Sequence, residues 1–75
     1  MNLHEPVRPA WRCAACDEEW PCWHRRRELT LACQGSRVTL ALMLAEYFSE
    51  AAADRPEIPA SVLYLRFLGW LRVPQ

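Results

Sequence analysis

Apolar side chains recur with a helical period over residues 37–54. Strong helix formers fill most of the remaining positions, and Ser36 offers an N-cap. The helix should end before Pro56, because proline disfavours helical geometry in the residue that precedes it. The apolar positions are Leu40, Ala41, Leu42, Leu44, Ala45, Phe48, Ala51 and Ala52. The pattern therefore predicts an amphipathic helix over Arg37–Asp54.

Two shorter helices are predicted on either side of this one. The first starts at Arg25 and stops at Gly35, which can adopt the left-handed conformation that ends many helices. The other runs over about Ala60–Arg72, opened by Pro59 and closed by Pro74. The chain thus contains about three helices after its first third.

The helix expected after Pro59 is apolar on every side. Only Ser61, Arg66 and Arg72 place polar side chains on its surface, and a helix that is apolar all round should be buried. The apolar residues are Val62, Leu63, Tyr64, Leu65, Phe67, Leu68, Trp70 and Leu71. A chain of 75 residues cannot cover all of them. We therefore expect a protein partner or a homodimer through the helical part.

The first 24 residues show no sustained period. They hold three of the six prolines and three of the four cysteines, which is typical of a loop-rich segment. A chain this short has a marginal core and commonly needs a metal or a partner. We predict one domain over residues 1–75, of small mostly α class, with a metal knuckle in residues 1–24 packed on the helices of residues 25–75.

Three cysteines provide the main chemical signal. Cys13-x-x-Cys16 places two thiolates on one short turn, and Cys22 adds a third ligand soon afterwards. The flanking residues Trp11, Trp20 and Trp23 are expected to shield a bound ion. Zn²⁺ in a structural site prefers four such ligands.

The fourth ligand is open among several candidates. His4 lies on a proline-containing arm that can fold back across the knuckle, and we favour it. Cys33 falls near the end of a helix, where a buried free thiol is the usual interpretation. His24 follows Cys22 closely, and water is a further alternative.

Charge and residue types limit the other functions. Nine cationic and nine acidic side chains give zero net charge, and all the cations are arginines. Direct nucleic-acid binding is not expected, and the dense run Arg25–Arg27 is interpreted as a solvated helix face next to Glu28. Asp17–Glu19 are interpreted as solvated carboxylates. No activated nucleophile or acid–base pair is evident, so we expect no enzyme.

The chain carries no apolar stretch of signal-peptide or membrane-spanning kind. The longest apolar run, Leu40–Ala45, is too short to cross a bilayer. We therefore expect a cytoplasmic protein without membrane contact. Paired cysteines in that compartment are more often metal ligands than disulfides.

The motifs resemble those of a group of short actinobacterial zinc-knuckle proteins. The matching residues are His4, Trp11-x-Cys13-x-x-Cys16, Trp20-Pro21-Cys22 and the closing Phe67-Leu-Gly-Trp70. The resemblance covers nearly the whole chain and implies His4 as the upstream ligand and a shared fold. Some proteins of this group are named flavin reductase. That activity is not supported here, because the chain has only two glycines and lacks a phosphate-cradling loop.

The cysteine spacing is also similar to that of WhiB-like iron–sulfur regulators. Those proteins use an N-terminal cysteine where this chain has His4, and their glycine-rich turn and basic tail are missing. The leading hypothesis is a structural-zinc protein with a regulatory or adaptor role. The alternative is an iron–sulfur or thiol-based redox sensor.

Overall fold

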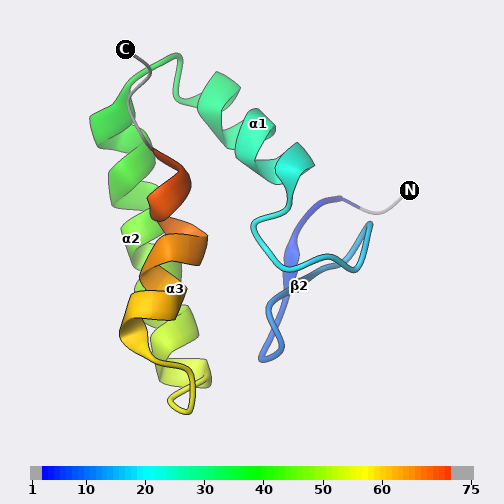
Figure 1. Ribbon diagram of the computed structural model, residues 1–75. Helices are drawn as coiled ribbons and strands as arrows, with labels where there is room; N and C mark the ends of the chain where they lie inside the picture. Colours follow the sequence, from blue (N-terminus) through cyan, green and yellow to red (C-terminus); the bar gives the residue numbers. More distant parts are fainter. Residues whose placement is uncertain (1–2, 72–75) are drawn as a thin grey trace.

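The computed structural model describes residues 3–71, and its helices follow a small N-terminal hairpin (Figure 1). In chain order the elements are β1 (Pro6–Val7), β2 (Arg12–Cys13), α1 (Trp23–Ala32), α2 (Arg37–Asp54), α3 (Ala60–Phe67) and the 3₁₀ turn η1 (Gly69–Leu71). The small mostly α class is confirmed. The antiparallel pair β1–β2, with Pro6 opposite Cys13, was not predicted, because two-residue strands carry no alternating pattern.

Helix α2 has the predicted bounds. The Ser36 side chain accepts a hydrogen bond from the Thr39 backbone N–H at 3.3 Å, which satisfies one of the free donors of the first turn. The helix ends at Asp54, and Arg55 has already left helical geometry in front of Pro56. Local sequence signals therefore determine both ends of the longest helix.

Helix α1 begins two residues before the predicted start. Trp23 and His24 belong to the helix, so the predicted start at Arg25 is two residues too late. Cys22 occupies the N-cap position without a capping side-chain hydrogen bond, which explains why no capping signal marked the start. At the other end the chain turns through Gln34 and Gly35, with φ of 52° and 80°, as expected for a left-handed stop.

The last helix is shorter than predicted. Helix α3 ends at Phe67, and the chain tightens into η1 after Leu68; Arg72 and Pro74 lie outside the described residues. The tighter turn brings Trp70 and Leu71 against a second core cluster, which the periodicity of one helix could not predict. That cluster is formed by Leu29, Leu40 and Leu44.

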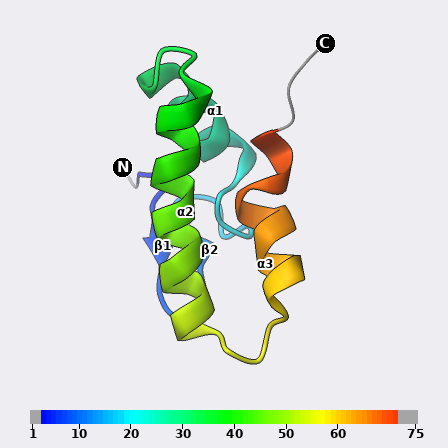
Figure 2. The same ribbon diagram turned by 90° about the vertical axis from the view of Figure 1, so that its left-hand side faces the viewer.

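The helical part and the knuckle form two layers. Helices α2 and α3 run antiparallel as a hairpin (Figure 2), and the N-terminal segment with α1 lies across one side of it (Figure 1). The main core cluster fills the space between the layers. Its buried members are Trp11, Cys13, Trp20, Cys22, Ala51, Leu63 and Phe67.

Aromatic rings of the two layers pack against one another. Trp11 packs edge-on against Phe67 with ring centroids 5.5 Å apart, and Trp20 packs against Tyr47 at 4.7 Å. Trp11, Trp20 and Phe67 are almost completely buried. Buried aromatic pairs of this geometry add to the free energy gained by removing apolar area from water. The knuckle is therefore part of the hydrophobic core.

Two polar contacts fix the orientation of the knuckle on the helices. The Arg66 guanidinium of α3 donates to the carbonyl oxygen of Trp20 at 2.8 Å and to that of Trp11. At the end of α2, the Asp54 carboxylate accepts from the Trp11 indole at 2.9 Å and from Arg8. Hydrogen bonding to Arg8 holds the pKa of Asp54 below its ordinary value.

Among the residues that the structure describes, no helix combines the length and the apolar character needed to cross a membrane. Helix α2 is the longest, with 18 residues, and glutamates and an aspartate interrupt it.

Replacing Arg66 by Met should destabilise the fold by about 1–3 kcal/mol, because two half-buried carbonyl groups lose a charged donor while the apolar stem is retained. Chemical denaturation measures this difference. Arg37→Met is the matched control, since Arg37 is exposed at the start of α2. Equal stability of the two variants would contradict the role given to Arg66.

Candidate metal centre

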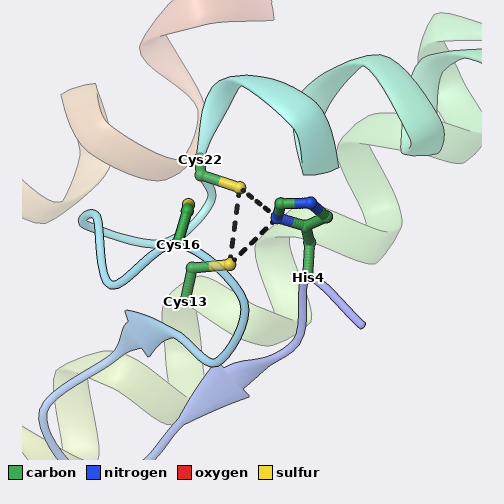
Figure 3. A group of neighbouring side chains, drawn as sticks. All are labelled: His4, Cys13, Cys16 and Cys22. Atoms are coloured by element: carbon green, nitrogen blue, oxygen red, sulfur yellow. Dashed lines mark hydrogen bonds between the residues drawn. The ribbon is translucent and has the colours of Figure 1, made fainter. Parts of the chain in front are cut away.

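Four side chains from separate parts of the N-terminal segment meet at one point. His4 precedes β1, Cys13 ends β2, Cys16 lies in the turn that follows, and Cys22 stands directly before α1. Figure 3 shows these side chains gathered around a common centre. Each contributes one nitrogen or sulfur atom, and all four atoms lie within 4.8 Å of one another.

The spacing of these atoms matches the coordination shell of a single ion. His4 Nδ1 lies 3.1 Å from Cys13 Sγ and 3.4 Å from Cys22 Sγ, and the two sulfur atoms are 3.7 Å apart. Ligand bonds of Zn²⁺ in a tetrahedron place neighbouring sulfur and nitrogen atoms about 3.5–3.8 Å apart. Such an ion requires only small movements of these side chains.

The backbone of the Cys13–Cys16 turn is fixed by its own hydrogen bonds. The Asp17 N–H donates to the Cys13 carbonyl oxygen at 2.8 Å, and the Cys13 N–H donates to the Glu18 carbonyl oxygen at 2.8 Å. Asp17 adopts a positive φ of 60°, a conformation that aspartate tolerates better than most residues. This turn places Cys16 next to Cys13.

His4 is held by contacts on both sides. The Trp20 indole N–H donates to the His4 carbonyl oxygen at 3.1 Å. The imidazole stacks on His24, with ring centroids 4.7 Å apart and planes inclined by 26°. Sixteen residues separate His4 from Trp20, so no local sequence signal could have indicated this positioning contact.

The protonation of two thiols differs sharply. Burial raises the pKa of Cys13, but hydrogen bonds from the backbone N–H groups of Cys16 and Ala15 outweigh it and lower the pKa to about 6. Burial raises the pKa of Cys22 to about 11, and the neighbouring Cys13 adds to that rise. At neutral pH Cys13 is therefore a thiolate that accepts a hydrogen bond from the Cys22 thiol.

The alternative ligands lie elsewhere. Cys33 faces Met43, with their sulfur atoms 3.6 Å apart, in the second core cluster. His24 stacks on His4 and is not one of the four residues whose donor atoms converge. Of the candidates weighed for the fourth position, only His4 has its donor atom beside the cysteines.

Two of the three tryptophans that were expected to shield a bound ion lie beside the cysteines. Trp11 and Trp20 are buried in the same cluster as Cys13 and Cys22. Trp23 does not lie with them, because its side chain is 62% exposed on the outside of α1. Trp23 is the first residue of α1 and therefore belongs to the helix surface, not to the knuckle.

The carboxylates around the centre are solvated, as expected, whereas Arg25 and Arg26 of the predicted solvated helix face are only half-exposed. Asp17–Glu19 are exposed, and Arg25 pairs with Glu28 one helical turn away at 3.2 Å. Four protein donors around one ion complete a tetrahedral shell, which is the arrangement of structural zinc sites. The chemistry that this set of residues favours is binding of a soft divalent ion.

No protein family model, curated protein or solved structure matches the chain. The resemblance to short actinobacterial zinc-knuckle proteins therefore stays a prediction.

Zinc affinity should rise with pH, because Cys22 enters the site as a thiol and must lose a proton to become a ligand. Cys13, with a pKa of about 6, is already a thiolate at neutral pH and adds little to this dependence. From about pH 7 to about pH 8 the apparent dissociation constant should fall at least about tenfold. Competition with a chromophoric chelator measures it, and a constant independent of pH would contradict the assignment of Cys22.

Proposed function

We propose that this chain is a structural-zinc protein whose ion is bound by His4, Cys13, Cys16 and Cys22. Zinc holds the N-terminal segment on the helices and takes no part in a reaction. The role of the whole protein is regulatory or adaptor, through apolar side chains that the helices expose. The observation that carries the zinc proposal is the convergence of one imidazole nitrogen and three sulfur atoms within 4.8 Å.

The close spacing of the donors supports one ion over an iron–sulfur cluster. In a cluster, the protein ligands are distributed over several iron atoms and stand farther apart than the ligands of one ion. Here Cys13 Sγ lies within 3.7 Å of both Cys22 Sγ and His4 Nδ1. These distances are typical of ligands that share one metal.

A structural role follows from the position of the ligands in the core. Cys13 and Cys22 are 2% and 3% exposed and belong to the cluster that joins the two layers. If no ion is bound, a buried thiolate lacks a positively charged partner, and burying an unpaired charge costs free energy. Metal binding and folding should therefore be coupled.

Substituting Cys16 by Ser should remove zinc and lower the melting temperature by at least about 10 °C, because losing one ligand costs several kcal/mol in a chain of this size. Elemental analysis and circular dichroism measure both quantities. Protein prepared without oxygen also distinguishes the metals, since an iron–sulfur cluster is brown and zinc is colourless.

Cys33→Ser is the matched control for this experiment. It makes the same replacement of sulfur by oxygen at a cysteine that is not one of the four donors. The chain should therefore keep about one zinc and melt within about 4 °C of the parent protein. Equal losses in both variants would show a general effect of removing a thiol. A parent chain that holds no metal and keeps its fold in strong chelator would refute the proposal.

The proposed interface lies on α3. Val62 and Leu65 are 51% and 67% exposed and stand one turn apart on the same face. The net charge of zero leaves little repulsion between two copies of the chain, and proteins near neutrality associate readily. We therefore assign this face to a second copy, in a dimer that forms the adaptor.

In sedimentation experiments the apparent mass should rise with concentration toward that of a dimer. The double variant Val62→Ser/Leu65→Ser should remain a monomer at all concentrations, because it removes the apolar area that drives association. Val38→Ser is the control, since Val38 is 72% exposed but lies on α2. Loss of association in the control, or a parent chain that is always a monomer, would contradict this interface.

A further inference from the structure

A pocket of about 400 Å³ lies between the outer face of α1 and the 3₁₀ turn η1. In Figure 2, α1 lies behind α2, and the orange-red turn η1 lies beside α2 at the end of α3. The pocket joins two sequence features that the zinc site does not use, the arginine run and the closing tryptophan. Its lining residues are Trp23, Arg26, Arg27, Thr30, Leu31 and Trp70.

The two indole rings and two guanidinium groups of this pocket are paired. The Arg26 guanidinium lies over the Trp70 ring at 5.4 Å, and that of Arg27 lies over the Trp23 ring at 5.7 Å. Such pairs keep a cation and an aromatic face side by side at the same surface. A ligand entering the pocket meets flat rings and positive charge together.

The positive charge of the pocket is not neutralised by the described part of the chain. None of the six lining residues is acidic, and Arg27 forms no ion pair there. Arg26 donates one hydrogen bond, from Nε to the Pro21 carbonyl oxygen at 2.9 Å, which leaves its terminal nitrogens available. Arginine presents these N–H groups in a fork that matches carboxylate and phosphate oxygens.

One polar atom of a lining residue has no hydrogen-bond partner. Trp70 Nε1 is buried and has no hydrogen-bond acceptor among the described residues. A buried indole N–H usually has an acceptor, and its absence carries a free-energy cost. The ligand chemistry of the pocket is therefore set by the accessible ring faces and guanidinium groups.

We propose that this pocket binds a small planar aromatic molecule that carries an oxyanion, either a carboxylate or a phosphate. The ring packs against the indoles of Trp23 and Trp70, and the oxyanion accepts hydrogen bonds from Arg26 and Arg27. The volume lies in the range of small-molecule sites. Binding needs no contact with the metal ligands, so it does not depend on the ion being zinc.

The test is an NMR titration of the metal-loaded full chain with three naphthalene probes. Naphthoate and naphthyl phosphate carry the oxyanion, whereas naphthalenemethanol has the same rings without charge. The indole N–H signals of Trp23 and Trp70, assigned with Trp→Phe variants, should shift with naphthoate, with naphthyl phosphate or with both. The anion that binds more tightly identifies the oxyanion, and the neutral probe should bind more weakly.

Arg27→Gln is the diagnostic variant, because Arg27 is exposed and its loss should not affect folding. Binding of the anionic probe should weaken about fivefold, the upper end for an exposed ion pair. Arg37→Gln removes the same charge outside the pocket and should leave affinity unchanged. Equal binding of the neutral probe, equal losses in both variants, or no shift at millimolar probe would each overturn the proposal.

Discussion

Trp20 is the residue through which the metal centre and the fold depend on each other. Its ring is completely buried between the layers, its indole N–H donates to the His4 carbonyl oxygen, and its own carbonyl oxygen accepts from Arg66. One side chain thus fills the core and positions a donor, while its backbone is fixed by α3. The coupling requires all three contacts, because each one restrains a different part of the same residue.

This coupling explains how so short a chain can place four donors. The segment that carries the cysteines also supplies Trp11 and Trp20, so packing these rings against Phe67 brings Cys13 and Cys22 into the core. Their burial is tolerable only if the charge of the thiolates is compensated, which hydrogen bonds do in part and a divalent ion would do fully. The hydrophobic effect and the coordination chemistry therefore favour the same arrangement.

Local signals predicted the features that depend on neighbouring residues. The bounds of α2 follow from a helical period, a serine cap and a proline, and the Cys13-x-x-Cys16 turn follows from spacing. Features that depend on distant contacts could not be predicted in this way. Helix α3 ends early because Trp70 packs on the second core cluster, and α1 begins at Trp23 without a capping side chain.

Helix α1 connects the proposed metal site to the proposed pocket. Cys22 stands at its N-cap, and the pocket face begins with the very next residue, Trp23. A short helix with no side-chain cap and little amphipathic character gains most of its order from tertiary contacts. Fixing Cys22 on an ion therefore restrains the first turn of α1, where Arg26 already donates to the Pro21 carbonyl oxygen beside the ligand. Because the same turn carries the cationic groups of the pocket, loss of the metal should loosen the pocket before the contacts between α2 and α3 are disturbed.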